Sequence, residues 1–260
     1  VVGIVISILL FFFSLSTMTT TMMIGFRFGF LLLLLLFAVS VGAAAEKDVD
    51  ERCQGWAEQG ECGANPRYML SNCAASCRMV KETQMRQQAL LQDVDDFYDL
   101  EARTLQGQLL RFERLRGSVV VITNVASECG YTESHYRGLV ELWSNVSTEN
   151  VYILAFPCNQ FGNQEPGSPT EIQAFANEKG VEFTMMEKID VNGPHTSVVY
   201  LYLKDKARTP QGGSMQSITW NFATYFVVSP DGKTITAYNG VEPMDLLQDP
   251  IMKLLGKEEL

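Results

Sequence analysis

The sequence predicts an α/β protein with a central mixed sheet flanked by helices, preceded by a small disulfide-stapled helical module. Three observations support this prediction. Short β-branched runs bounded by turn residues alternate with segments whose apolar residues have helical spacing. The tripeptide Pro230-Asp231-Gly232 separates two strand-like runs and predicts a hairpin, which makes the sheet mixed in direction. Four cysteines lie between Cys53 and Cys77, in a stretch too short for a hydrophobic core without cross-links.

The elements of the large domain are expected in a defined order. A hairpin turns at Gly107 between 97–105 and 108–112, and a β-branched run over 118–124 predicts a buried central strand. Apolar residues at helical spacing predict a helix over 133–143. The other expected elements are a short helical linker over 81–93, a strand over 151–156, a helix over 171–179, a helical or strand-like segment over 196–203, hairpin strands over 224–228 and 234–238, and a helix over 244–255.

The composition excludes several classes of function. The chain has 260 residues and a net charge of −10, and an acidic chain lacks the basic face that a general nucleic-acid binder needs. A content of 47% hydrophobic residues argues against a disordered chain. The only histidines are His135 and His195, which excludes a His-rich metal site. We therefore expect neither a metal nor a nucleic-acid partner.

The beginning of the chain has the features of a signal peptide. Residues 1–45 contain a single charged residue, Arg27, followed by an apolar run with six consecutive leucines. The run ends at Ala43-Ala44-Ala45, the small residues that a signal peptidase needs. We interpret 1–21 as upstream sequence. The alternative is an uncleaved anchor, because 28–45 reaches the lower limit of a membrane span, and a membrane contact is expected only through such an anchor.

The end of the chain has the features of a retrieval signal. The last four residues, Lys257-Glu258-Glu259-Leu260, resemble a KDEL-type tail, although a solvated helix end has a similar composition. Together with a signal peptide, the tail predicts the lumen of the endoplasmic reticulum, where disulfides are permitted. Secretion is the alternative.

The stretch over 46–80 is dense in cysteines and turn residues, which favours disulfide staples. Its motifs are Cys53-x-x-Trp56-Ala57, Gly60-Glu61-Cys62-x-x-Asn65-Pro66-x-Tyr68-Met69-Leu70 and Cys73-x-x-Ser76-Cys77. Spacing alone leaves three pairings open, and the absence of a nearby histidine disfavours a zinc site. The pattern resembles the ShK toxin-like (ShKT) domain. The resemblance implies the bridges Cys53–Cys73 and Cys62–Cys77, while Glu46 and Val80 stand where the family has its outer bridge.

Cys129 has the setting of a reactive thiol. It follows the strand expected over 118–124 and precedes the helix expected over 133–143. The unpaired N–H groups and the dipole of a helix start favour an anion, and the thiolate is the reactive form of cysteine. The neighbouring Glu128 opposes a thiolate, and an inert buried thiol is the alternative.

Three motifs in a fixed order include this cysteine. They are Asn124-Val125-Ala126-Ser127-Glu128-Cys129-Gly130-Tyr131-Thr132, then Phe156-Pro157-Cys158-Asn159-Gln160-Phe161-Gly162-Asn163-Gln164-Glu165-Pro166-Gly167, then Trp220-Asn221-Phe222. Over 94–256 the chain resembles glutathione peroxidases, in particular the cysteine-type members that reside in the endoplasmic reticulum. The resemblance implies a thioredoxin-like fold. It also implies that Cys129 reduces peroxides through a sulfenic acid, in a catalytic tetrad with Gln164, Trp220 and Asn221.

The resemblance leaves the reducing step open. The resolving cysteine of two-cysteine members is absent, because Phe175-Ala176-Asn177 stands at its position. Cys158 is the candidate resolving residue that remains. Glutathione, or a protein dithiol such as protein disulfide isomerase or a thioredoxin-like protein, is the expected co-substrate, with no other cofactor. The oligomerisation loop of tetrameric members is not evident, so a monomer open to hydrogen peroxide or lipid hydroperoxides is expected.

Two further expectations concern the surface. Asn145-Val146-Ser147 is a glycosylation sequon, placed near the end of the helix expected over 133–143. The alternative to an enzyme is a redox sensor or binding protein that docks a membrane or channel partner through the ShKT-like module.

Overall fold

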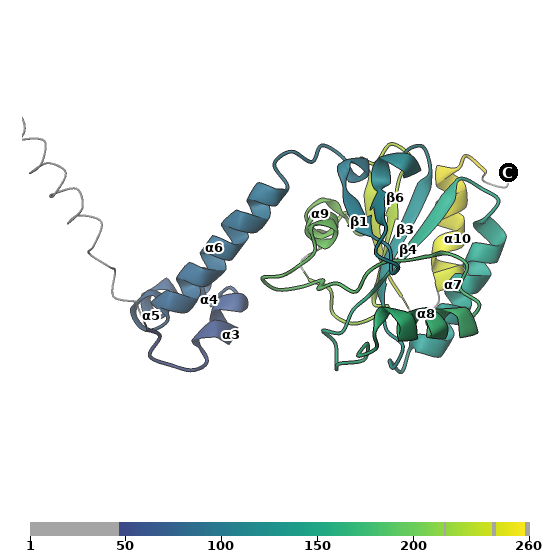
Figure 1. The fold of residues 1–260 in the computed structure, drawn as a ribbon. Coiled ribbons are helices and arrows are strands. Elements are labelled where there is room, and N and C mark those ends of the chain that lie inside the picture. The colour runs from purple at the N-terminus through teal and green to yellow at the C-terminus, as the bar shows by residue number, and fades with distance from the viewer. Residues whose placement is uncertain (1–46, 216, 241–242, 258–260) are drawn as a thin grey trace, which may run out of the picture. The chain divides into compact units, whose positions relative to one another are not determined.

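The computed structural model describes residues 47–215, 217–240 and 243–257, which form two compact units (Figure 1). The first unit ends at Cys77 and the second begins at Arg78. The expected signal peptide over 1–45 lies outside the described residues, as does the retrieval tail after Lys257. Within the described ranges, no helix combines the length and the apolar character needed to cross a bilayer.

The first unit is a module of short helices cross-linked by two disulfides. It contains α3 (Cys53–Glu58), α4 (Glu61–Ala64), α5 (Pro66–Asn72) and the start of α6 (Ala74–Leu90). The disulfides join Cys53 to Cys73 and Cys62 to Cys77, which is the pairing that the ShKT resemblance implies. The carboxyl of Asp48 accepts hydrogen bonds from the backbone N–H groups of Ala75 and Ser76, the orphan donors at the start of α6.

Helix α6 continues without a break beyond the expected end of the module at residue 80. It extends to Leu90, so the segment expected as a separate linker over 81–93 forms the second half of a longer helix. The residues over 78–90 include no glycine or proline, and most of them are strong helix formers. Nothing in this stretch therefore interrupts a helix that has begun at Ala74.

The second unit is built on a mixed five-stranded sheet with strand order β5-β4-β3-β6-β7. Strand β3 (Val119–Val125) is central, as expected, and all seven of its residues are buried. It pairs in parallel with β4 (Val151–Pro157) and antiparallel with β6 (Thr224–Val228). The edges are β5 (Thr184–Met185) and β7 (Ile235–Asn239), and the latter forms the expected hairpin with β6. The expected first hairpin consists of β1 (Glu101–Arg103) and β2 (Leu109–Arg111).

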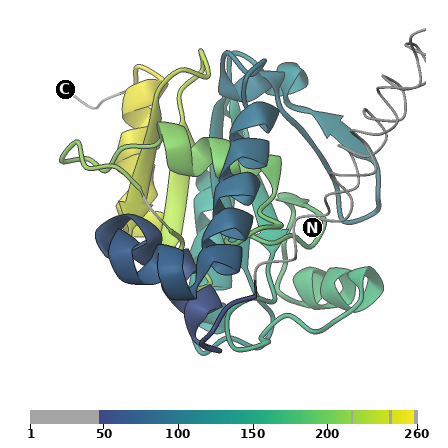
Figure 2. The same ribbon diagram turned by 90° about the vertical axis from the view of Figure 1, so that its left-hand side faces the viewer.

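The sheet separates two hydrophobic clusters. One face is covered by α7 (Thr132–Val146), α8 (Pro169–Glu178) and α10 (Pro243–Leu254). The other face is covered by α9 (Val198–Lys206) and the 3₁₀ turns η1 (Phe97–Asp99) and η2 (Phe112–Leu115). In Figure 2, α9 lies in front of the strands in light green. The segment 196–203, for which the sequence permits a helix or a strand, is helical from Val198 onward. The arrangement is the thioredoxin-like α/β fold that the resemblance implies.

Candidate active site

Cys129 lies in the turn between β3 and α7, where the sequence placed it. Thr132 closes the turn: its hydroxyl accepts from the Cys129 N–H at 3.1 Å and donates to the Ala126 carbonyl at 2.7 Å. The Thr132 N–H in turn donates to the Cys129 carbonyl at 3.0 Å. Cys129 is 7% exposed and precedes the positive end of the α7 dipole. The turn therefore holds a nearly buried thiol at a helix end that favours an anion.

The loop after β4 brings Gln164 to this turn. The backbone N–H of Glu128 donates to the Gln164 carbonyl at 3.0 Å. Gly162 and Asn163 both have positive φ, of 64° and 53°, which reverses the chain just before Gln164. A Cβ at Gly162 would meet the Gln164 side chain at 3.4 Å, so the glycine leaves room for that amide.

The segment before β6 supplies the two other tetrad residues. The buried Asn221 donates from Nδ2 to Gln164 Oε1 at 3.5 Å, and its Oδ1 accepts from the Asn124 amide at 3.1 Å. Phe222 has a φ of 63°, and its N–H donates to the Asn124 carbonyl at 2.9 Å. Trp220 is 38% exposed and contacts the ring of Phe161. Three segments distant in sequence thus meet at the C-terminal ends of β3 and β4.

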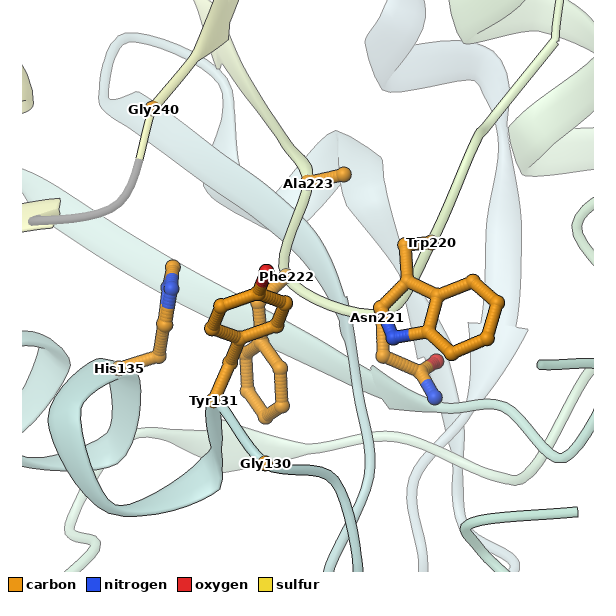
Figure 3. Close-up of a pocket in the computed structure, with 8 residues that line it drawn as sticks. All are labelled: Gly130, Tyr131, His135, Trp220, Asn221, Phe222, Ala223 and Gly240. Carbon is orange, nitrogen blue, oxygen red and sulfur yellow. The ribbon is translucent and has the colours of Figure 1, made fainter. Parts of the chain in front are cut away.

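A pocket lies beside this meeting point (Figure 3). It is lined by Gly130, Tyr131, His135, Trp220, Asn221, Phe222, Ala223 and Gly240. Figure 3 shows the Tyr131 ring between His135 and the pair formed by Trp220 and Asn221. The His135 Nδ1 is hydrogen-bonded to the hydroxyl of the buried Tyr225. The lining is therefore largely aromatic, with the Asn221 amide and the Trp220 indole as its polar edge.

Sequence reasoning missed most of these aromatic residues. Tyr131 belongs to the first motif, lines the pocket and is 51% exposed, and membership of the motif does not by itself indicate this placement. His135 lies one helical turn after Tyr131 on α7, and this i, i+4 spacing is the signal that places both on one face.

Glu165 is a further residue that the sequence did not single out. Its side chain is fully buried, and its Oε1 accepts from the Ser127 hydroxyl at 2.8 Å. Burial raises the pKa of this carboxyl, while the Ser127 hydrogen bond and the charge of Lys188 act in the opposite direction. A charged residue inside a polar motif gives no sequence signal of burial, because burial here depends on how two loops pack.

The candidate resolving residue, Cys158, is not placed with Cys129. It is fully buried and belongs to the cluster under α9, whereas Cys129 belongs to the cluster under α7. Burial raises the pKa of the Cys158 thiol, which lowers its thiolate fraction. The two free cysteines thus lie in different hydrophobic clusters, and no disulfide joins them in this structure. Resolution by Cys158 stays a prediction.

The structure also describes the glycosylation sequon and bears on metal binding. Asn145 is exposed near the C-terminal end of α7, and its amide donates to Gln248 Oε1 at 3.4 Å. Within the described ranges, no group of three His, Cys, Asp or Glu side chains is placed to hold a metal ion.

Comparison with family models matches the two units separately. Residues 97–204 match the model described as glutathione peroxidase, and residues 46–79 match the model described as ShK domain-like.

Similar proteins are found in several organisms. Human glutathione peroxidase 7 is 41% identical over 170 residues, which cover 65% of this chain and 87% of the human protein. Glutathione peroxidase-like peroxiredoxin 2 of Saccharomyces cerevisiae is 42% identical over 162 residues, covering 62% of this chain and 98% of the yeast protein. The crystal structure of T. cruzi GPX1 superimposes with a TM-score of 0.51 at 26% identity, covering 64% of this chain and all of that one.

Proposed function

Because this chain belongs to the glutathione peroxidase family, we propose that it reduces hydrogen peroxide or lipid hydroperoxides through Cys129. The thiolate sulfur attacks one peroxide oxygen, forming an S–O bond as the O–O bond breaks. The departing oxygen takes a proton and leaves as water or as an alcohol, and the sulfur becomes a sulfenic acid. The supporting observation is the convergence of the three motifs, with the Asn221 amide on Gln164 beside the turn of Cys129.

The tetrad residues supply hydrogen-bond donors for this step. Negative charge develops on the departing oxygen, and fixed donors near it stabilise the transition state. Asn221 and Gln164 carry amide N–H groups, and Trp220 carries an indole N–H at the edge of the pocket. Because Asn221 is bonded to both Asn124 and Gln164, its amide is oriented before the peroxide arrives.

An external thiol is the proposed reductant of the sulfenic acid. Its sulfur attacks Cys129, water leaves, and a mixed disulfide forms, which a second thiol then reduces. The placement of Cys158 in the opposite hydrophobic cluster favours an external thiol for the first of these steps. Glutathione or a protein dithiol, such as protein disulfide isomerase or a thioredoxin-like protein, can fill this role.

Peroxide consumption by a variant at Cys129 tests the proposed function. Stopped-flow measurement on the purified protein with a thiol reductant is expected to show loss of peroxide with wild type and only the background rate with Cys129→Ser. Cys158→Ser is the matched control, because it also removes one buried free thiol, and its first oxidation step should match that of wild type. Equal rates for Cys129→Ser and wild type would exclude the proposed chemistry.

The proposed compartment is the lumen of the endoplasmic reticulum. The two disulfides of the module support the secretory pathway, because such bonds persist in oxidising compartments. Retention in the lumen rests on the tail Lys257-Glu258-Glu259-Leu260. Deletion of the tail should move the protein from the cell to the medium, and unchanged retention would contradict a role for the tail.

A further inference from the structure

The buried carboxyl of Glu165 lies between the two loops that carry Cys129 and Gln164. Its Oε1 accepts from the hydroxyl of Ser127, two residues before Cys129, at 2.8 Å. Its backbone N–H donates to Asn159 Oδ1 at 2.8 Å, which holds Glu165 within its own loop. The side chain is fully buried, and among the described residues Oε2 has no hydrogen-bond partner. Burial of a carboxyl costs free energy when one of its oxygens has no hydrogen-bond partner, so the single bond to Ser127 offsets only part of that cost.

We propose that Glu165 is a positioning residue for the peroxidase reaction: through Ser127, its carboxyl fixes the turn of Cys129 against the loop of Gln164. This inference rests on the proposed function and adds to it a residue outside the tetrad. Among the described residues, the hydrogen bond of the Glu165 side chain goes to Ser127 and not to Cys129.

Two parallel connections make up the link between the loops. Ser127 bonds the Glu165 side chain, and the next residue, Glu128, bonds the Gln164 carbonyl through its N–H at 3.0 Å. Adjacent residues of one loop are thus tied to adjacent residues of the other. Cys129 follows immediately, so the position of its sulfur relative to the tetrad amides depends on both bonds. A displacement of the order of 1 Å at a reacting group can cost roughly 100-fold in rate.

The surroundings of the carboxyl favour its neutral form. Burial raises the pKa of Glu165, and Glu128 raises it further, whereas Ser127 and Lys188 lower it. Lys188 is bonded to the backbone carbonyls of Glu165 and Gly167 rather than to the carboxyl itself. Burial raises the pKa of Tyr136 on α7, with a smaller contribution from the Glu165 charge, and among the described residues the Tyr136 hydroxyl is also buried without a partner. A charge on Glu165 also raises the pKa of Cys158 after β4.

Three variants separate positioning from a general structural role. Ser127→Ala and Glu165→Ala each remove the side-chain bond between the loops and leave the backbone bond from Glu128 to Gln164, whereas Glu165→Gln keeps an oxygen that can accept from Ser127. We expect single-turnover oxidation of Cys129 by hydrogen peroxide to slow by roughly 10- to 100-fold in the first two variants. Glu165→Gln should stay within about threefold of wild type, because its amide oxygen restores the bond. If Glu165→Ala fails to fold, Ser127→Ala decides, since it removes only a hydroxyl.

The chain offers a matched control at Glu171. Its carboxyl also accepts from a serine hydroxyl, that of Ser168 at 2.7 Å, but it is exposed at the start of α8 and distant in sequence from the turn of Cys129. Glu171→Ala should leave the oxidation rate unchanged. An equal loss in Glu171→Ala and Glu165→Ala would overturn the inference, as would wild-type rates in both Ser127→Ala and Glu165→Ala.

Two readouts do not depend on peroxide turnover. Hydrogen exchange at the Glu128 amide should accelerate in Ser127→Ala and Glu165→Ala but not in Glu165→Gln, and unchanged exchange would contradict the link.

The second readout is the pH dependence of stability. Because the pKa of the Glu165 carboxyl is raised in the folded state, its contribution to stability is present below the unfolded pKa and is lost as pH rises through the folded pKa. As pH rises from the unfolded pKa of Glu165 to its folded pKa, the melting temperature of wild type should therefore fall relative to that of Glu165→Gln, which has no ionisable group at this position. If wild type consumes no peroxide, the proposed function fails, while the exchange data still test the link.

Discussion

At the scale of single residues, the site combines a rigid buried part with a partly exposed edge. Asn221 is 1% exposed and is held by Asn124 and Gln164, whereas Trp220 is 38% exposed and contacts Phe161. The two hydrogen bonds hold the buried amide in one orientation, and the exposed indole lines the pocket beside the turn of Cys129. The Asn221 amide and the Trp220 indole are therefore donors in different settings, one buried and one partly exposed, and each can be tested by its own substitution.

Replacing Trp220 by phenylalanine removes the indole N–H and keeps an aromatic ring beside Phe161. We expect Trp220→Phe to slow oxidation of Cys129 by roughly 100-fold, the order of loss measured when one fixed donor is removed from a developing oxyanion. Stopped-flow oxidation under single-turnover conditions measures this rate. Trp143→Phe is the control, because Trp143 packs against the core from α7 and does not line the pocket. Equal rates for Trp220→Phe and wild type would remove the indole from the proposed tetrad.

Strand alternation can predict the face of the sheet on which Cys158 lies, but not the position of Cys129. Leu154, Phe156 and Cys158 alternate along and just after β4 and share one hydrophobic cluster, so period-two counting could have placed Cys158 on that face. Cys129 lies in a turn, where no such periodicity applies. Its position in the opposite cluster depends on how the turn folds back under α7.

At the scale of elements, the chain relies on two different devices for stability. The second unit buries a sheet between two hydrophobic clusters. The first unit has helices of four to seven residues besides the start of α6, and such short helices are marginal by themselves. Its disulfides replace the missing core.

Removal of either bridge should destabilise the first unit. The bridged residues are 20 positions apart for Cys53–Cys73 and 15 for Cys62–Cys77. Each double Cys→Ser variant should lower the free energy of unfolding by about 3 kcal/mol, because the unfolded chain gains freedom. Urea unfolding in a Trp143→Phe/Trp220→Phe background, in which Trp56 of α3 is the only tryptophan, measures the loss by fluorescence. Oxidation of Cys129 should stay within about twofold of wild type, and an unchanged unfolding midpoint would contradict the assignment of the bridges as structural.

Element prediction from the sequence succeeded where local chemistry was strong. The β-branched run predicted β3, and Pro230-Asp231-Gly232 predicted the hairpin of β6 and β7. The two residues of β5 are too few for any periodicity to appear. The segment 196–203 was ambiguous because its valines and tyrosines favour strands as well as buried helices. Packing against the sheet decides in favour of α9.

At the scale of the whole molecule, the sequence predicted two units and the order of three motifs in the larger one. The meeting of those motifs follows from the sheet order, because parallel strands β3 and β4 end at the same edge and β6 begins there. The role of Glu165 could not be predicted in this way. Its burial depends on the contact between two loops, each of which is irregular and polar in sequence.

The account's central claim is that peroxide oxidises Cys129 to a sulfenic acid, and chemical trapping tests it most directly. The reduced protein is treated with one equivalent of hydrogen peroxide in the presence of dimedone, digested and analysed by mass spectrometry. The account predicts a dimedone adduct on Cys129 and, when glutathione or a protein dithiol replaces dimedone, a mixed disulfide at the same sulfur. A Cys129–Cys158 bond formed without added thiol would assign resolution to Cys158. Loss of peroxide with Cys129 unmodified, or with the adduct on Cys158 alone, would contradict the claim.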